Sequence, residues 1–369
     1  MSSEIGLGAL PAQTLREFIK RDLIIGGNPP QVSPASLDLT LSSEAYQING
    51  LLLPQKEETV RELLPRMGAK KVSLGEPLLC QQLYLVKLNE SLQLPNDIYG
   101  YCNPKSSTGR LDTHVRVLAD GVPRFDSVTP AGFTGELWLA IHPKSFSLQV
   151  HVGTPLTQLR LFNGDIRFND ERLRNEIEQG LVFDRHTGRC LEYEELVTNE
   201  QDGTVVLTAL VNNENCGFVC IANPEQVLDT ALINHYDASD FFEPIFARDG
   251  LLQLEQNKFY ILSSAEAVRL SPSVASEMVP IDERSGDFRS HYAGFLDPGW
   301  GYGHDGQESG RPFTLEVRPF ENMLVRAGQP IAKIRFEEMS AVPDIHYDTK
   351  ESNYLQQDGP KLGKQFKDI

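Results

Sequence analysis

The chain contains few cysteines, and none of them are spaced as in a metal site. Five cysteines occur in 369 residues, at positions 80, 102, 190, 216 and 220, and no two of them are separated by only two residues. An odd and scattered set of thiols argues against both a disulfide framework and a structural zinc site. We therefore expect reduced thiols within the core of a protein of a reducing compartment, the cytoplasm.

The chain also lacks long apolar runs and basic tracts. No segment approaches the roughly 18 apolar residues that span a membrane, and residues 1–10 lack the basic and apolar regions of a secretory signal. The 34 Lys and Arg residues are outnumbered by 51 Asp and Glu residues, which gives a net charge of −17. We therefore expect neither nucleic acid nor membrane as a partner. A small phosphorylated ligand is still compatible, because a few converging cationic groups reverse the local field.

An internal repeat is the most informative feature that is present. Residues 137–143 (LWLAIHP) are followed ten residues later by 153–161 (GTPLTQLRL), and residues 313–319 (FTLEVRP) are followed nine residues later by 328–336 (GQPIAKIRF). Each block predicts a strand that ends at proline, a second strand, a Gly-x-Pro turn and a third strand.

A third block precedes these in each half. Residues 105–110 (KSSTGR) align with residues 284–289 (RSGDFR), since each block has a basic residue, a serine and an arginine four residues after that serine. Three blocks in the same order indicate a duplicated domain rather than a solenoid of short repeats.

The predicted fold is mainly β, with two tandem domains and short peripheral helices. The domains are expected at 1–168 and 204–369, joined by a helical and irregular connector over 169–203. The connector begins with a short helix over residues 169–180, where Asn169 is the cap and Gly180 the stop. Helical periodicity is otherwise confined to the N-terminal residues 15–23 and to residues 60–67.

Several motifs resemble the dUTPase and dCTP deaminase superfamily. Residues 34–41 (PASLDLTL) and the 105–110 block are similar to motifs of the superfamily as a whole. In the second half, residues 293–300 (AGFLDPGW) are similar to the deaminase hairpin that ends in Ile-Asp-Pro-Gly-Trp. Residues 313–317 (FTLEV) are similar to the strand that carries the deaminase glutamate, and residues 353–359 (NYLQQDG) to the C-terminal segment that closes over nucleotide.

This resemblance implies two dUTPase-like β-barrel or β-clip domains whose active sites form between neighbouring units. It implies zinc-independent hydrolysis of dCTP to dUTP and ammonia, a step that feeds dUMP and dTTP synthesis, with Mg²⁺ accompanying the triphosphate. Two units do not close a threefold ring, so we expect a homo-oligomer, with a trimer of two-domain chains as the first expectation.

The chemistry of deamination suits a carboxylate at position 316. Water must attack the ring while a proton moves to N3 and to the departing amine. Zinc deaminases use H-x-E and P-C-x-x-C motifs for this step, and the chain has no P-C-x-x-C motif. Glu316 alternates with apolar Leu315 and Val317, so it projects from the opposite strand face. We predict that it is the general base and acid, against the ordinary alternative of a solvated glutamate.

Ser106 and Arg110 are predicted to complete the catalytic group by orienting water and triphosphate, since Arg offers a bidentate fork to phosphate oxygens. The alternative for both is simple surface polarity. No residue is predicted to bind a metal. The expected nucleotide contacts are Lys105, Ser107, Arg284, Ser285, Arg289, His291, Ala293, Asp297, Tyr347 and Gln357.

The first copy lacks the carboxylates of the second. Thr129 and Ala140 stand where the second copy has Asp297 and Glu316. We therefore predict that the first copy is a supporting partner. Its 105–110 block would serve Glu316 in the same chain or in a neighbour. The second copy in turn departs from the family pattern by an inserted, glycine-rich loop over 301–311.

Three other functions are compatible with parts of the pattern. Asp297 lies near the position of the water-activating aspartate of dUTPases, so a dUTPase or a bifunctional enzyme that converts dCTP to dUMP is the nearest alternative. A nucleotide-binding regulator without catalysis is the second, because the first copy has lost its own carboxylates. An unrelated β-rich structural protein would require the ordered motifs to coincide by chance.

Overall fold

The computed structural model describes residues 6–196, 201–212, 214–281, 288–290, 294–349 and 358–367. Strands dominate these ranges, and the mainly β fold with short helices predicted from the sequence is confirmed. None of the helices described is both long and apolar enough to cross a bilayer. The α-helices are α1 (Ala12–Lys20), α2 (Val60–Leu63), α3 (Ser106–Gly109) and α4 (Asp170–Glu178).

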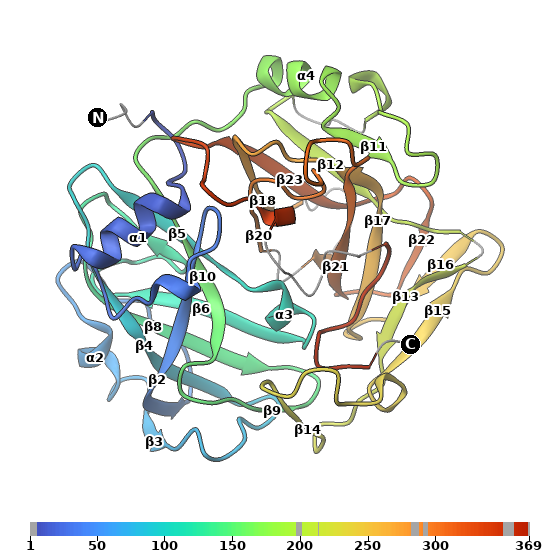
Figure 1. The fold of residues 1–369 in the computed structure, drawn as a ribbon. Coiled ribbons are helices and arrows are strands. Elements are labelled where there is room, and N and C mark those ends of the chain that lie inside the picture. The colour runs from blue at the N-terminus through green and yellow to red at the C-terminus, as the bar shows by residue number, and fades with distance from the viewer. Residues whose placement is uncertain are drawn as a thin grey trace.

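Most strands of the first half form one antiparallel sheet, on the left of Figure 1. Its main path runs β6–β8–β4–β2–β10–β5–β7, with β1 paired to β4 and β3 paired to β2. The bounds are β1 (Ile24–Ile25), β2 (Leu37–Ile48), β3 (Lys70–Val72), β4 (Leu83–Gln93), β5 (Tyr99–Pro104), β6 (Thr113–Ala119), β7 (Ser127–Val128), β8 (Thr134–Pro143) and β10 (Pro155–Phe162).

The second half, on the right of Figure 1, contains two main sheets. One follows the order β15–β13–β17–β21–β19, with β11 on β17, and the other follows β12–β23–β18–β20; β16 pairs with β22 separately. The bounds are β11 (Val182–Asp184), β12 (Thr204–Thr208), β13 (Asn215–Cys220), β15 (Phe242–Phe246), β16 (Leu251–Leu254), β17 (Tyr260–Val268), β18 (Val274–Val279), β19 (Phe288–Ser290), β20 (Phe295–Leu296), β21 (Arg311–Pro319), β22 (Met323–Arg326) and β23 (Pro330–Glu338).

The repeated blocks fold as the sequence predicts. β8 and β21 end at the prolines of the two blocks, Pro143 and Pro319, and each is followed by a short strand and then a longer one. The glycines of the Gly-x-Pro turns, Gly153 and Gly328, have φ values of 85° and 76°. These left-handed conformations cost glycine little, which explains why both turns carry it.

The two halves also share a buried polar contact outside the aligned blocks. Thr40 donates its backbone N–H and its hydroxyl to the carboxylate of Glu90, at 2.8 and 2.7 Å. Thr208 donates in the same way to Glu266, at 2.8 and 2.6 Å. A buried carboxylate needs such donors. The same threonine–glutamate hydrogen bonds occur in both halves, which supports the duplication.

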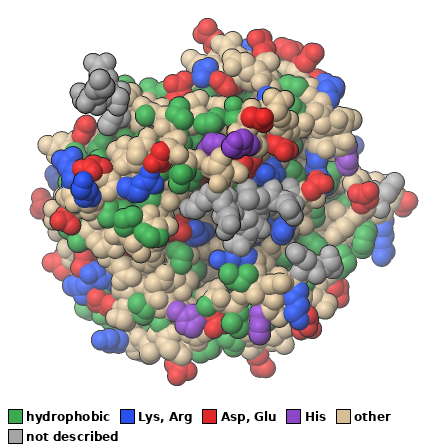
Figure 2. Space-filling view, viewed as in Figure 1, with side chains coloured by type: hydrophobic (Ala, Val, Ile, Leu, Met, Phe, Trp, Pro, Cys, Tyr) green, Lys and Arg blue, Asp and Glu red, His purple; other side chains and the backbone are tan. Residues whose placement is uncertain are grey.

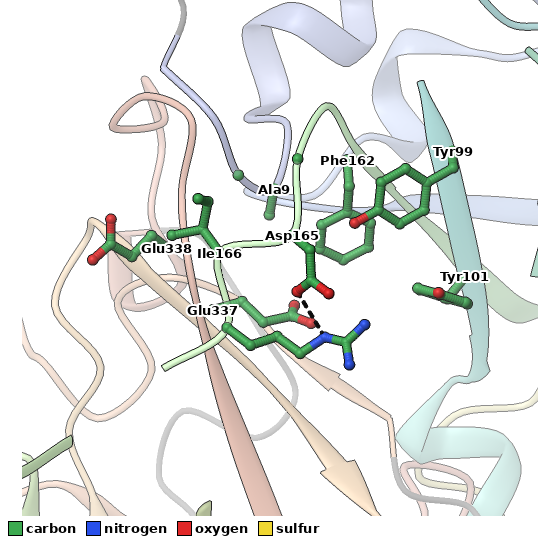
Figure 3. A pocket seen from close by; sticks show the side chains of 11 residues that line it. Ala9, Tyr99, Tyr101, Phe162, Asp165, Ile166, Glu337 and Glu338 are labelled. Atoms are coloured by element: carbon green, nitrogen blue, oxygen red, sulfur yellow. Dashed lines mark ion pairs between the residues drawn. The ribbon is translucent and has the colours of Figure 1, made fainter. Parts of the chain in front are cut away.

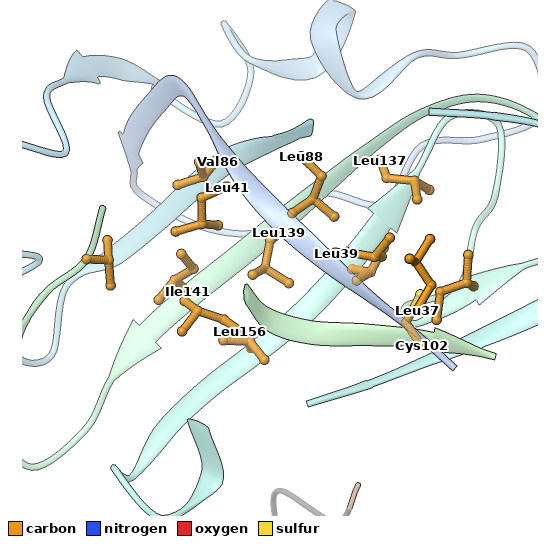
Figure 4. Close-up of a cluster of buried hydrophobic side chains, with 14 of the residues drawn as sticks. Leu37, Leu39, Leu41, Val86, Leu88, Cys102, Leu137, Leu139, Ile141 and Leu156 are labelled. Carbon is orange, nitrogen blue, oxygen red and sulfur yellow. The ribbon is translucent and has the colours of Figure 1, made fainter. Parts of the chain in front are cut away.

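Alternating side chains fill the first core. Leu37, Leu39 and Leu41 of β2 share it with Leu139 and Ile141 of β8 (Figure 4). Since side chains alternate between the faces of a strand, residues two apart enter the same core. Both strands therefore turn one apolar face inward.

The halves are packed together rather than linked loosely. Leu173 and Ile177 of α4 belong to the second core, and β11 extends a second-half sheet, so the connector packs with the second half. At another point β9 (Ser147–Gln149) pairs in parallel with β14 (Val227–Asp229) across the halves. This contact holds the two β units in a fixed relation.

Candidate active site

The serine–arginine block of the first half forms a single helical turn between β5 and β6. Lys105 precedes α3, and Arg110 follows it with a helical backbone. The hydroxyl of Thr108 donates to the Leu156 carbonyl oxygen at 2.8 Å, which fixes the turn to β10. Arg110 is therefore presented from a rigid turn, and its side chain is buried. In Figure 1, α3 lies in the middle of the molecule, where the halves meet.

Glu316 lies on β21, in the sheet of the second half. Leu315 and Val317 enter the second core, and Glu316 points to the other face together with Thr314. This face is not solvated, because only 4% of Glu316 is exposed. The strand thus has the alternation predicted from the sequence, but its polar face lies against other parts of the chain.

The structure brings Arg110 and Glu316 together within one chain. The Nε atom of Arg110 lies 3.9 Å from Oε1 of Glu316, and the two side chains are 3% and 5% exposed. The ion pair crosses the boundary between the repeats. One chain is therefore sufficient to place the first-half block against the second-half glutamate.

Burial dominates the protonation of Glu316. Removal from water raises the pKa of this carboxyl to about 8, and the positive charge of Arg110 opposes the rise. A carboxyl with a pKa near neutrality exchanges protons readily at physiological pH. This is the property that a proton shuttle requires.

The hairpin that precedes β21 lies against the serine block. An added Cβ atom at Gly294 would lie 3.1 Å from the Pro104 carbonyl oxygen and 3.5 Å from Oγ of Ser106. The Ser106 hydroxyl therefore lies beside the backbone of the hairpin. Ser107 is the next residue of the same turn.

Lys105 is held by a partner from β2. Its Nζ atom lies 2.5 Å from Oδ1 of Asp38, within the first of the motifs found in the sequence. Burial, and then the charge of Lys105, lower the pKa of Lys364 in the C-terminal segment. Two lysines therefore share this side of the site with one aspartate.

The C-terminal segment passes over the polar face of β21. The Thr314 hydroxyl lies 3.4 Å from the Gly359 carbonyl oxygen and 3.3 Å from the Lys361 nitrogen, and Arg110 donates from Nη1 to the Lys361 carbonyl oxygen at 3.0 Å. Beyond this point Phe366 packs among the rings of residues 236–242. The segment thus covers the Glu316 face and is anchored past it.

Asp297 lies in a buried network between the halves. Its Oδ1 atom is 3.4 Å from Nη2 of Arg160 and 3.4 Å from Oγ of Ser36. Arg160 is fully buried and also donates to the carbonyl oxygens of Ser276 and Leu296, each at 3.0 Å. The first half therefore holds the base of the hairpin that carries Asp297.

Tyr347 lies just after the last strand, beside the end of the hairpin. Its N–H donates to the Pro298 carbonyl oxygen at 2.8 Å, and its ring centroid is 4.9 Å from that of Trp300. The neighbouring Asp348 pairs with Arg311 at 2.7 Å, which closes the inserted loop over residues 301–311. The loop is therefore tied to the segment that contains Tyr347.

Several predicted contacts cannot be placed. Arg284, Ser285, His291, Ala293 and Gln357 lie outside the described residues, and Arg289 is described only through the backbone of β19. Among the residues that are described, no three His, Cys, Asp or Glu side chains are grouped as they would be to hold a metal ion.

The position equivalent to Glu316 in the first half is filled by apolar side chains. Ala140 is opposite Leu85 in the β8–β4 ladder, as Glu316 is opposite Ile261 in the β21–β17 ladder. Ala140 packs with Trp138 and with residues 60–67 from α2 and its flank. In the first half, an apolar cluster therefore covers Ala140, at the position where the second half has Glu316.

A crevice at another part of the interface is separate from this site. Tyr99, Tyr101 and Phe162 line it from the first half and Glu337 from the second (Figure 3). Burial raises the pKa of Glu337 to about 7. None of the residues predicted for catalysis lines this crevice.

Sequence reasoning missed the roles of several residues at the site. Arg160 and Asp38 lay within quoted motifs but were read only as strand residues. An arginine between two core leucines, as in Leu159-Arg160-Leu161, was a usable signal, because a buried charge requires partners. Thr314 and Lys364 gave no comparable signal.

The chain is similar to proteins of one family over nearly its whole length. The family model described as the 2′-deoxycytidine 5′-triphosphate deaminase N-terminal domain matches residues 6–165, and the model of the C-terminal domain matches residues 180–366. A crystal structure of 2′-deoxycytidine 5′-triphosphate deaminase from Agrobacterium tumefaciens superposes with a TM-score of 0.81. It shares 35% sequence identity, over 91% of this chain and 97% of that chain. Curated protein sequences gave no match.

Proposed function

The chain belongs to the dCTP deaminase family, and we propose that it hydrolyses dCTP to dUTP and ammonia without zinc. The observation that carries this proposal is the buried Glu316 carboxylate, which faces Arg110 from the other repeat at 3.9 Å. A carboxylate buried beside one guanidinium is arranged for proton transfer rather than for solubility.

The proposed mechanism uses Glu316 as a proton shuttle. The ionised carboxylate takes a proton from water while the water oxygen bonds to C4 of cytosine, and the proton is passed to N3. A second transfer, from the new hydroxyl to the amino nitrogen, allows the C4–N bond to break. Ammonia leaves, and C4 retains a carbonyl oxygen.

Ser106 and Arg110 are proposed to assist this step from the first half. The serine hydroxyl orients the attacking water, and the guanidinium stabilises the ionised form of Glu316 and negative charge in the transition state. Their presentation on one rigid turn supports these roles, because catalysis depends on fixed geometry.

The remaining contacts are assigned to the nucleotide. Lys105, Ser107, Arg284, Ser285 and Arg289 are proposed to bind the triphosphate, which arrives with Mg²⁺ as part of the substrate. The proposed contacts to base and deoxyribose are His291, Ala293, Asp297, Tyr347 and Gln357.

Product analysis tests the proposal. Purified protein given dCTP and Mg²⁺ should release ammonia and dUTP in equal amounts, and Glu316→Gln should lower kcat about 1,000-fold. Glu136→Gln is a matched control, because Glu136 lies on the corresponding strand β8 and pairs with Lys87 at the surface. It should retain activity.

Other products would favour other functions. Release of pyrophosphate would indicate dUTPase activity, either alone or together with deamination. Binding of dCTP without turnover at any pH would indicate a regulator and would contradict the proposal.

A further inference from the structure

A second pair of opposite charges joins the halves beside Arg110 and Glu316. Asp112 follows Arg110 by two residues, and Arg318 follows Glu316 by two residues on β21. Arg318 donates from Nη2 to the carboxylate of Asp112, which is fully buried, while the Arg318 side chain is 20% exposed. Along the chain, the first half thus supplies Arg110 followed by Asp112. The second half supplies the opposite order of charge, Glu316 followed by Arg318. The two ion pairs cross the interface close to each other.

The carboxylate of Asp112 is fixed by its own turn. The N–H of Asp112 donates to the Gly109 carbonyl oxygen at 2.9 Å, and its carbonyl oxygen accepts from the Lys144 N–H at 3.0 Å. The hydroxyl of Ser145 also donates to the carboxylate. This turn is the one that presents Arg110, so the positions of the two side chains are linked.

The guanidinium of Arg318 is held on three sides. Nη1 donates to the Asn257 carbonyl oxygen, Nη2 lies 3.3 Å from Oγ of Ser145, and the centroid of the Phe259 ring is 6.0 Å away. Because strand residues two apart share a face, Arg318 and Glu316 project to the same side of β21. Arg318 is therefore aimed at the turn after α3.

The first repeat lacks this arrangement where it lacks the glutamate. The sequence alignment that matches Ala140 with Glu316 also matches His142 with Arg318. The Nε2 atom of His142 lies 3.4 Å from Nζ of Lys144. Arg318 therefore occurs in the repeat that has Glu316, and the other repeat has neither. An arginine that served only to pack the repeat would be expected in both.

We propose that Arg318 is a positioning residue that keeps Arg110 directed at Glu316 by neutralising Asp112, an inference that rests on the deaminase function proposed above. A buried anion without a cation is strongly unfavourable. If Arg318 is removed, Lys144 and Arg110 are cations that remain near Asp112, and Arg110 belongs to the same turn, two residues away. Turning toward Asp112 would take Arg110 from the catalytic carboxylate.

The expected effect on pH dependence follows from the charges at this interface. Of these, Arg110 lowers the pKa of Glu316, so losing it raises that pKa further and moves the acidic limb of the kcat profile to higher pH. Other charged or titratable residues described in the elements packed here include Asp38, Cys80, Lys105, Asp112, His142, Lys144, Cys220, Arg318, Lys361 and Lys364.

Paired substitutions test the proposal. Arg318→Gln should lower kcat about 100-fold, the cost typical of a misplaced catalytic group, and should move the acidic limb upward. Asp112→Asn added to Arg318→Gln should restore most of kcat and move the acidic limb of the pH profile back to its wild-type position. In the double variant no buried anion competes for Arg110. Arg318→Lys should lose less than Arg318→Gln. Arg116→Met, which breaks the ion pair between Arg116 of β6 and Asp126, is the matched control and should change neither kcat nor the pH of the acidic limb.

A purely structural role gives a different pattern. The double variant would then be no better than Arg318→Gln, thermal stability would fall additively, and the pH limb would not move. That result would overturn the proposal.

Crystal structures separate this inference from the proposed function. Arg318→Gln should show Arg110 turned from Glu316 to Asp112, and the double variant should show the original contact. This readout needs no turnover, so it remains decisive if the wild-type protein fails to release ammonia. An Arg110 side chain that stays at Glu316 in Arg318→Gln contradicts the inference.

Discussion

At the scale of single residues, Glu316 differs from an ordinary strand glutamate in what covers it. The C-terminal segment and the turn after α3 remove it from water, and Arg110 is the charge that opposes the resulting rise of its pKa. Folding therefore places an ionisable group where its charged form is disfavoured. Such a site is destabilising by itself, which is typical of functional positions.

Glu316→Gln should change how stability depends on pH. The folded pKa of Glu316 is about 8 and its ordinary value is 4.5, so between these pH values the folded chain binds more protons than the unfolded chain. The free energy of unfolding of the wild-type protein therefore falls as pH rises through this window. Glutamine does not ionise, so the variant does not show this fall. From pH about 5 to about 8.5, the Tm of the variant should gain about 2 °C or more relative to wild type. Parallel Tm curves would show that Glu316 ionises normally.

At the scale of elements, the site depends on how the C-terminal segment is fastened. Gly359 and Lys361 bind Thr314 on β21, the strand that carries Glu316, and Phe366 inserts between Phe241 and Phe242, with ring centroids 5.3 and 5.4 Å away. The contacts on β21 are few and polar, and the aromatic anchor is apolar and buried. The anchor therefore contributes most of what holds the segment in place.

Phe366→Ala should release this segment. Loss of a buried phenylalanine removes about 3 kcal/mol or more of packing, so the cover over Glu316 should open and KM for dCTP should rise about tenfold. Steady-state kinetics check this. Lys367→Ala is the control, because the exposed side chain of Lys367 pairs with Asp237 at the surface. Equal KM values for Phe366→Ala and wild type would show that the segment is not a lid.

At the scale of the whole molecule, the two repeats bring different side chains to the interface between them. The first supplies Ser106 and Arg110 and has an apolar cluster at its own glutamate position, while the second supplies Glu316. Acidic and basic side chains are interspersed over the face shown in Figure 2. Because one chain brings Arg110 to Glu316, this pair does not require a second chain, and the trimer expected from the sequence stays a prediction.

Co-expression of two inactive variants distinguishes sites within a chain from sites between chains. Arg110→Met and Glu316→Gln should each be inactive, and the mixture should stay inactive if each site is built from a single chain. Sites formed between randomly mixed chains would restore about a quarter of the activity, because half of the chains carry an intact Arg110 and half carry an intact Glu316. Wild type co-expressed with either variant is the control for dilution.

Local patterns in the sequence were sufficient for several parts of this fold. The alternation around Glu316, the prolines at 143 and 319 and the Gly-x-Pro turns predicted strands and turns that the structure contains. A short serine–arginine motif also identifies Ser106 and Arg110 as candidate site residues. Such features depend on contacts between near neighbours, and these are written in consecutive residues.

The sequence by itself determined that this chain is a duplicated, mainly β protein with a deaminase-like glutamate in its second copy. Only the tertiary structure decided that the first-half serine–arginine block meets Glu316 within one chain, that Arg160 holds Asp297, and that Asp112 pairs with Arg318. These contacts join residues more than 130 positions apart. Their partners are fixed by how the two β units pack, so no local pattern of charge or periodicity specifies them.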